Sequence, residues 1–305
     1  MGVALTARAL RTAALAAAGL LASGAPAAQP ARVVDVAQLP SAWGLREISG
    51  LAWAPDGQTL YAVSDRGRLW RLAVAIERTG DGERLRLDGP PQRITLAAGL
   101  RPNAEALAWR APHAAAPAGG LLIADEQAHQ ALLIDLQGRH LATLALPGTP
   151  PTDAKGGDYG VEAMGWHPVH GMMAALQRPP RGADRQVHLL HSGDGRTWGF
   201  EAAAARTSLK ALEVAADGVW VLEKIDQGKT HRTLLRRLSA QACAPQQLCE
   251  SARLELKDPR LRAEDNFEGL ACRPDGWCLL GSDDGGSADG RTLLMLVHLP
   301  GRRRN

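Results

Sequence analysis

The sequence predicts an all-β fold, a single-domain β-propeller of four-stranded blades, and three observations lead to this prediction. A strand-turn-strand unit recurs five times at intervals of about 50 residues, and such a period is typical of propellers and solenoids. The chain of 305 residues contains 33 glycines and 19 prolines, as expected for many strands joined by tight turns. Helical periodicity is scarce beyond the N-terminus. The number of repeats favours five blades.

Each repeat consists of two apolar runs separated by a turn. The first runs cover residues 48–53, 103–109, 161–166, 208–214 and 266–272, and the second runs cover 60–65, 121–125, 172–177, 219–223 and 278–284. Because residues equidistant from the turn of an antiparallel hairpin face each other, the start of each first run lies beside the end of the second. We therefore expect five similar hairpins with corresponding polar ends.

Two further strand-like runs follow each of the first four hairpins. They cover residues 69–76 and 92–96, 131–135 and 140–146, 187–190 and 197–200, and 233–238 and 253–256. The fifth hairpin is followed only by residues 292–299, so the run at 32–36 is expected to complete this blade and close the ring. A six-bladed ring, the alternative, needs a further hairpin, and none is left over.

The two ends of the chain are expected to lie outside the propeller, which we place at residues 32–300. Arg8 and Arg11 precede an Ala/Leu-rich run at 12–21, and Ala25-Pro26-Ala27 is typical of a signal-peptide cleavage site. Residues 1–28 therefore predict a secretory signal peptide and a periplasmic or secreted protein. No other run is long enough for a membrane span. Residues 301–305 form a basic tail.

The four cysteines favour an oxidising compartment. Cys272 and Cys278 flank a turn, and Cys243 and Cys249 flank a loop, so we expect each neighbouring pair to form a disulfide. A zinc site made of all four is the alternative, but neither pair has the usual ligand spacing. The net charge of +3 is too small to indicate a nucleic acid partner. We expect a monomer.

Polar residues recur near the start of the first run of each repeat. Aligned on the end of that run, they are Ser49, Glu105, Glu162, Ser208 and Glu268, with Lys210 an alternative to Ser208 in the fourth repeat. The first strand of a blade lines the central channel, where facing carboxylates repel each other unless a cation lies among them. Oxygen ligands from several strands suit calcium. The alternative is that these side chains bond to backbone groups and join neighbouring blades.

A second polar set ends the second run of each repeat, namely Asp65, Asp125, Gln177, Glu223 and Asp283, and several of these have a charged neighbour. Mixed acids and cations around a metal suit an anionic ester or phosphoester. We expect catalytic roles for Asp65, Arg66, Asp125, Glu126 and Glu223, and substrate-binding roles for Arg178, Lys224 and Asp283. The alternative is that these are solvated strand ends.

Several of these segments resemble the phytase-like propeller family described as "esterase-like activity of phytase". The resemblance rests on Ser49–Trp53 with Leu60–Gly67, on Ala124–Glu126, and on Asp265–Leu270. A more distant resemblance is to the calcium-activated nucleotidases, or apyrases, which are five-bladed propellers with one axial oxygen ligand per blade in the order Ser, Glu, Glu, Ser, Glu. This resemblance implies calcium on the axis. The Asp-Asp-Pro-Ala sequence of true propeller phytases is absent, so inositol phosphate hydrolysis is not implied.

The sequence therefore predicts an exported propeller that hydrolyses an anionic ester or phosphoester with the help of calcium. The alternative is a non-catalytic binding or scaffold propeller in which calcium is purely structural.

Overall fold

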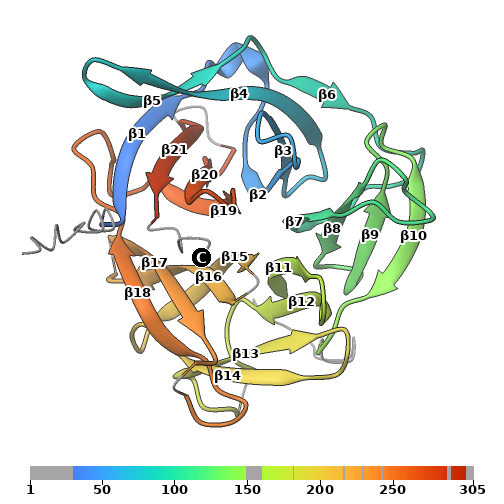
Figure 1. Cartoon of the computed structure of the whole chain (residues 1–305), viewed down its shortest axis with the longest axis vertical. Coiled ribbons are helices and arrows are strands. Elements are labelled where there is room, and N and C mark those ends of the chain that lie inside the picture. The colour runs from blue at the N-terminus through green and yellow to red at the C-terminus, as the bar shows by residue number, and fades with distance from the viewer. Residues whose placement is uncertain are drawn as a thin grey trace, which may run out of the picture.

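The computed structural model describes residues 30–148, 160–180, 182–215, 217–228, 230–241, 243–286 and 290–299. The predicted signal peptide and basic tail lie outside these residues. The described chain forms five antiparallel sheets arranged around a central axis, as Figure 1 shows. This confirms the five-bladed propeller and excludes the six-bladed alternative.

Each blade places one strand of a hairpin next to the axis. The innermost strands are β2 (Ile48–Trp53), β7 (Ala104–Arg110), β11 (Val161–His167), β15 (Thr207–Ala215) and β19 (Asn266–Cys272), and their partners are β3 (Thr59–Ser64), β8 (Gly120–Asp125), β12 (Gly171–Leu176), β16 (Gly218–Asp226) and β20 (Trp277–Asp283). The outer strands are β4 (Leu69–Thr79), β5 (Gly82–Leu87) and β6 (Gln92–Ile94), β9 (Gln130–Ile134) and β10 (His140–Ala145), β13 (Val187–Ser192) and β14 (Thr197–Glu201), β17 (His231–Ser239) and β18 (Cys249–Glu255), and β21 (Leu293–His298) with β1 (Arg32–Gln38). All five predicted hairpins are present.

The ring closes between the two ends of the propeller. β1 pairs antiparallel with β21, so that Val33 lies opposite Val297 and Val36 lies opposite Met295. The fifth blade therefore takes its outermost strand from the N-terminal side of the chain, as the sequence predicts. This pairing covers the edge of β21, which would otherwise be open to other chains.

The first blade differs from the prediction in its outer part. The connection between the third and fourth runs contains an additional strand, β5, which pairs with the second half of β4, while β6 pairs with the first half. The missed strand reads Gly-Glu-Arg-Leu-Arg-Leu; only Leu85 and Leu87 pack against the core, so it lacks the apolar run by which the inner strands are recognised. It lengthens β4 and adds no blade.

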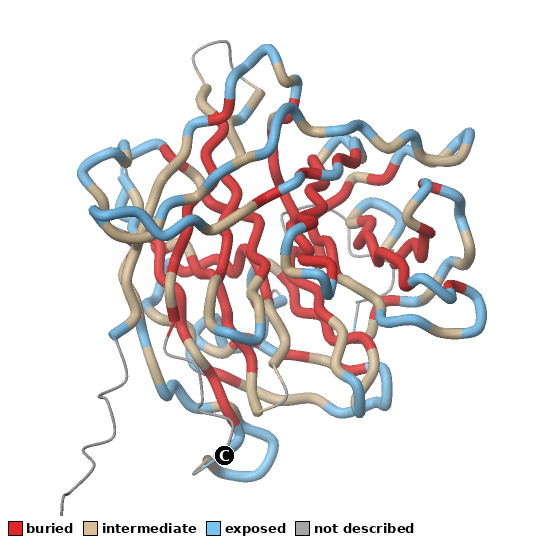
Figure 2. The backbone as a smooth tube through the Cα atoms, turned by 45° about the horizontal axis from the view of Figure 1, so that its top comes forward, coloured by how far each residue is buried: buried red, intermediate tan, exposed pale blue. Residues whose placement is uncertain are grey.

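The core lies between neighbouring blades, and the inner strands are buried almost throughout, as Figure 2 shows. The inner strands approach each other closely near one end of the channel. A Cβ atom added to Gly50 of β2 would lie 2.5 Å from the backbone nitrogen of Leu107 in β7. Small residues at this position therefore set the diameter of the ring.

Both predicted disulfides are present and the zinc alternative is excluded. Cys243 bonds to Cys249, and Cys272 bonds to Cys278 across the β19–β20 ladder. Disulfides form and persist mainly in oxidising compartments, which agrees with the predicted export. Among the described residues, no helix has the length and apolar character that a membrane span needs.

Candidate functional site at one mouth of the channel

A β-bulge occurs at the same place in every blade. In each hairpin the register between the first and second strands shifts by one residue, which leaves one residue of the first strand without a partner. From the first blade to the fifth, these unpaired residues are Ser49, Glu105, Glu162, Lys210 and Glu268. A bulge turns the side chain of its extra residue away from the regular alternation of the strand. We call these five residues the bulge ring; they lie at one mouth of the channel.

The fourth blade departs from the alignment made on Ser208. The shift in this blade lies between Leu209 and Ala211, so Lys210 occupies the bulge position, and Ser208 lies two residues earlier, paired with Lys224. The residue that follows the bulge is small in every blade: Gly50, Ala106, Ala163, Ala211 and Gly269. This small residue is the signal in the sequence that identifies Lys210.

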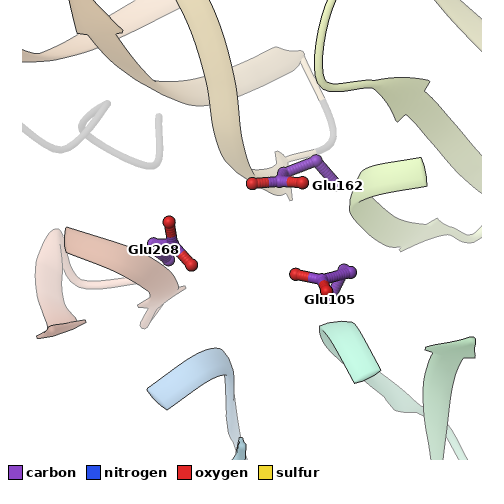
Figure 3. Close-up of side chains that lie close together, drawn as sticks. All are labelled: Glu105, Glu162 and Glu268. Atoms are coloured by element: carbon purple, nitrogen blue, oxygen red, sulfur yellow. The ribbon is translucent and has the colours of Figure 1, made fainter. Parts of the chain in front are cut away.

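Three carboxylates of the bulge ring converge on one point. Glu105, Glu162 and Glu268 point toward one another from β7, β11 and β19 (Figure 3), and one oxygen of each lies within 4.8 Å of the others. The Lys210 ammonium forms ion pairs with Glu162 and, at 2.5 Å, with Glu268. One ammonium group thus pairs with two of the three carboxylates.

Ser49 has a different role in the ring. Its hydroxyl lies 2.5 Å from the carbonyl oxygen of Ala104 in the next blade and 3.3 Å from that of Val63 in its own blade. It donates to these backbone acceptors and joins the first blade to the second. The contacts of Ser49 therefore agree with the alternative stated above, that these side chains bond to backbone groups and join neighbouring blades.

Glu105 is the carboxylate without an ammonium contact. The Asn103 side-chain amide donates to it at 3.3 Å. Burial, together with the negative charges of Glu162, Glu126 and Glu268, raises its pKa to about 9. Burial also raises the pKa of Glu162, against the opposing effect of Lys210, while the two carboxylates raise the pKa of Lys210. Glu105 therefore holds a proton at neutral pH unless a cation binds beside it.

A second set of side chains surrounds the bulge ring at the same mouth. Four of them end or directly follow the second strand and Lys224 lies within β16, and all are partly exposed: Asp65, Glu126, Gln177, Lys224 and Asp283. The residues just before them on the second strands are buried: Ser64, Asp125, Leu176, Glu223 and Ser282. We call the exposed set the outer ring.

The side chains of Asp125 and Glu223 are buried within their blades and do not face the mouth. Asp125 accepts hydrogen bonds from the backbone N–H groups of Asn103 and Ala128, at 3.3 and 3.2 Å. The Glu223 carboxylate is fully buried and pairs with Arg236 at 2.7 Å. These contacts stabilise the blades, and the neighbours Glu126 and Lys224 face the mouth instead.

Amide side chains connect the two rings, and the sequence analysis missed two of them. Gln177 donates to Glu162 at 2.9 Å. Asn266 donates to Glu268 at 2.7 Å and accepts from Lys224 at 2.9 Å. Asn103 donates to Glu126 at 2.9 Å as well as to Glu105. The repeated sequence Asn-x-Glu at 103–105 and 266–268 is the signal that could have identified both asparagines.

The place of Glu126 depends on Gly160 in the next blade. A Cβ atom at this position would lie 1.9 Å from the Glu126 Cγ and Oε1 atoms. The absence of a side chain at position 160 therefore makes room for Glu126 beside the carboxylates of the bulge ring, and Glu126 contributes to the raised pKa of Glu105.

Asp65 lies at the side of the mouth formed by the first and fifth blades. Burial, followed by the charges of Glu47 and Asp283, raises its pKa to about 6. Its Oδ1 atom is buried and has no hydrogen-bond partner among the described residues. The neighbouring Arg66 guanidinium is 60% exposed and pairs with Glu47 at 2.8 Å. A proton acceptor and a solvent-accessible cation are therefore adjacent here.

Arg178 lies beside a small cavity at the rim. The cavity has a volume of about 160 Å³ and is lined by Arg178, Arg185, Arg206 and Asp226 among others. Arg206 pairs with Asp226 at 2.8 Å, whereas Arg178 is exposed. The rim therefore offers guanidinium groups outside the acidic rings.

The charge at the mouth is strongly unbalanced. The two rings hold six carboxyl groups, on Asp65, Glu105, Glu126, Glu162, Glu268 and Asp283, and two ammonium groups, on Lys210 and Lys224. Carboxylate and amide oxygens are donors that suit a hard cation such as calcium. Three converging carboxylates beside amide oxygens fit such a cation, although Lys210 already occupies part of the cluster.

Comparison with known proteins gives a family and several remote structural similarities. A member of the DUF4221 family from Bacteroides vulgatus is 6% identical, with 88% of this chain and 97% of that chain covered and a TM-score of 0.48. A luciferin-regenerating enzyme is 10% identical, with 87% and 95% covered and a TM-score of 0.43. No argument rests on similarities at these scores.

No curated protein matches the chain in sequence. The model of the phytase-like family, described as "Esterase-like activity of phytase", matches residues 44–286, which span all five inner hairpins and both polar rings. The match covers most of the chain and includes the segments on which the resemblance in sequence rests. The chain belongs to the phytase-like propeller family.

Proposed function

We propose that the protein is a calcium-dependent hydrolase that acts on an anionic ester or phosphoester at this mouth. The observation that carries the proposal is the excess of carboxylates there, with three of their oxygens within 4.8 Å of one another. Such a mouth attracts cations and repels a free anion, so an anionic substrate requires a bound cation to approach it. The family description supports ester hydrolysis.

The residues of the two rings divide into three roles in this proposal. Glu105, Glu162 and Glu268 would hold the metal, which when bound supplies charge to polarise a substrate oxygen. Asp65, with a pKa of about 6, is suited to accept a proton from water near neutral pH. Arg66, Arg178 and Lys224 are placed to bind the oxygens of the anionic group.

Asp125 and Glu223, two of the residues expected to be catalytic, have no catalytic role in this proposal. Asp125 and Glu223 are buried and engaged by backbone and arginine donors. Glu126 takes the place of Asp125 beside Glu105, and Asp283 continues the outer ring on the side of Asp65. We further propose that the protein works outside the cytoplasm, where millimolar calcium and disulfides are both maintained.

Hydrolysis assays test this function. We expect turnover of at least one of p-nitrophenyl phosphate, p-nitrophenyl acetate, a nucleoside triphosphate or a lactone in millimolar calcium, and loss of that turnover in EGTA. Asp65→Asn should lower kcat by about 10²-fold or more, because it removes the proton acceptor. Glu264→Gln, at an exposed position in a loop, is the matched control and should retain full activity. Turnover that persists unchanged in EGTA would contradict the proposal.

The second candidate function is a binding propeller without catalysis, and Lys210 is the observation that favours it. Its ammonium lies among the carboxylates where a metal would bind, and it can serve as an internal counter-ion. This function predicts no hydrolysis of the whole substrate panel and no change of the melting temperature with calcium. The melting experiments in the Discussion separate the two functions.

A further inference from the structure

A cavity lies on the channel axis beyond the bulge ring. The inner strands run away from the bulge ring, and the residues four positions further along are Trp53, Trp109, Trp166, Val214 and Cys272. At about 3.3 Å per residue, these positions are about 13 Å from the carboxylates. The cavity has a volume of about 200 Å³ and is lined by residues of all five inner strands that surround the axis in Figure 1. All three tryptophans belong to its walls.

One carboxylate interrupts a ring of small side chains in this cavity. The position that follows the bulge residue by three holds Ala52, Ala108, Gly165 and Ala271 in the first, second, third and fifth blades and Glu213 in the fourth. Glu213 lines the cavity, and the backbone N–H of Cys272 donates to its carboxylate at 3.0 Å. Among the described residues it forms no ion pair with lysine or arginine. Burial raises its pKa to about 8.

The tryptophans already interact with cations at this end of the channel. The Arg110 guanidinium lies 3.6 Å above the ring centroid of Trp166, and that of Arg273 lies 5.8 Å from the centroid of Trp53. Neither guanidinium pairs with Glu213; Arg273 pairs with Asp275 instead. The third ring, Trp109, packs on Tyr61, and its Nε1 atom has no hydrogen-bond partner in the described part of the chain.

From these contacts we infer that the cavity binds a small organic cation, an alkylammonium or quaternary ammonium group, with Glu213 as its counter-ion and Trp53, Trp109 and Trp166 as its walls. Aromatic faces attract such cations, and the attraction increases when the cation is desolvated. Glu213 is the one carboxylate among the residues that line the cavity, whereas calcium takes six to eight oxygen ligands. The volume admits a group of several heavy atoms. This site is independent of the proposed hydrolase function.

Choline and its uncharged isostere 3,3-dimethylbutan-1-ol provide a direct test by isothermal titration calorimetry. Titrations at pH 8.5 keep most of the Glu213 carboxylate ionised, because its pKa is about 8. We expect choline to bind at least tenfold more tightly than the alcohol. Glu213→Gln should weaken choline binding at least tenfold and leave the alcohol unaffected. Glu264→Gln, at an exposed position outside the lining of this cavity, is the control and should bind choline as the wild type does.

Three results would overturn the inference. They are equal affinity for choline and the alcohol, choline binding that Glu213→Gln does not weaken, and displacement of choline by sodium or calcium at equal concentration, which would indicate an inorganic cation site. If Glu213→Gln does not fold, Glu213→Asp replaces it, since this variant keeps the charge and withdraws it by one methylene. It should weaken choline binding at least threefold, and an unchanged affinity would contradict the inference.

Discussion

Lys210 reduces the negative charge of the mouth, because the fourth blade has an ammonium group at the position where three other blades have a carboxylate. The ion pairs with Glu162 and Glu268 are buried, and a buried charge that loses its partner is strongly destabilising. The same ammonium opposes a metal ion at the cluster. We therefore expect Lys210 to raise the stability of the calcium-free protein and to lower its affinity for calcium.

Lys210→Met tests this balance. In EGTA the variant should lose about 3–5 kcal/mol in the free energy of unfolding, because the carboxylates are left without a counter-ion. Calcium should restore most of the loss and should bind at least tenfold more tightly than to the wild type. Denaturant unfolding with and without calcium measures both effects. Lys257→Met, whose side chain is 75% exposed, is the control. A Lys210→Met variant as stable as the wild type in EGTA would exclude this role.

The raised pKa of Glu213 predicts that the stability of the protein depends on pH. Its folded-state pKa is about 8 and its ordinary value is 4.5, so the folded state keeps a proton that the unfolded state loses between these two values. Stability from this group is fully present below about pH 4.5 and falls as pH rises toward 8, by at most about 1.4 kcal/mol per pH unit. Glu213→Gln should remove this slope.

The measurement is urea unfolding of the wild type and Glu213→Gln from pH 5 to 9. The Glu213 carboxylate accepts a hydrogen bond from the Cys272 N–H, and the guanidiniums of Arg110 and Arg273 lie over tryptophans of the same cavity; none of these groups titrates in this range. The stability of Glu213→Gln relative to the wild type should rise through this range. A constant difference would mean that the pKa of Glu213 is not raised.

The inner strand is the element that sets both the ring diameter and the direction of the site residues. Its period could be read from the sequence, because apolar runs recur with turns between them. The apolar pattern alone does not reveal the bulge, because one extra residue in a strand leaves that pattern almost unchanged; only the small residue after it marks the position. For this reason the alignment placed Ser208 rather than Lys210 in the bulge ring, and Asp125 and Glu223 at the mouth.

Gly50→Ala tests the close approach of the inner strands. The added Cβ would meet the Leu107 backbone at 2.5 Å, and backbone atoms yield less readily than side chains. We expect a loss of about 1–3 kcal/mol in the free energy of unfolding, the usual cost of overpacking. Gly80→Ala is the matched control, since a Cβ atom there meets nothing within 4 Å. Equal stability of the two variants would contradict the packing argument.

The architecture of the whole molecule was easier to predict from the sequence than its single elements or its side-chain contacts. Five repeats, the absence of a spare hairpin and the lone run at 32–36 together determine five blades and the closure of the ring, and the structure has both. The strand β5 was missed because its charged residues alternate with only two leucines that pack on the core, which leaves no apolar run. The charges of the site residues followed from the sequence, but their pairing depends on contacts between blades that are distant in the chain.

Removal of the closing strand tests the architecture as a whole. A chain that begins at Leu39 lacks β1 and exposes the edge of β21, so it should melt at a lower temperature and associate through that edge. A chain that begins at Pro30 retains β1 and should behave as the full-length chain does. Differential scanning calorimetry and light scattering measure the two effects. A monomer of unchanged stability without β1 would contradict the closure of the ring.

The central claim, a calcium ion held by the carboxylates of the mouth, is tested most directly by thermal unfolding in EGTA and in millimolar calcium. A ligand at a hundredfold excess over its Kd adds about 2.7 kcal/mol, which corresponds to a rise of about 5–10 °C for a domain of this size. We predict this rise for the wild type and its loss in Glu105→Gln/Glu162→Gln. Identical melting curves of the wild type in EGTA and in calcium would contradict the account and leave the Lys210 ammonium as the counter-ion of the clustered carboxylates.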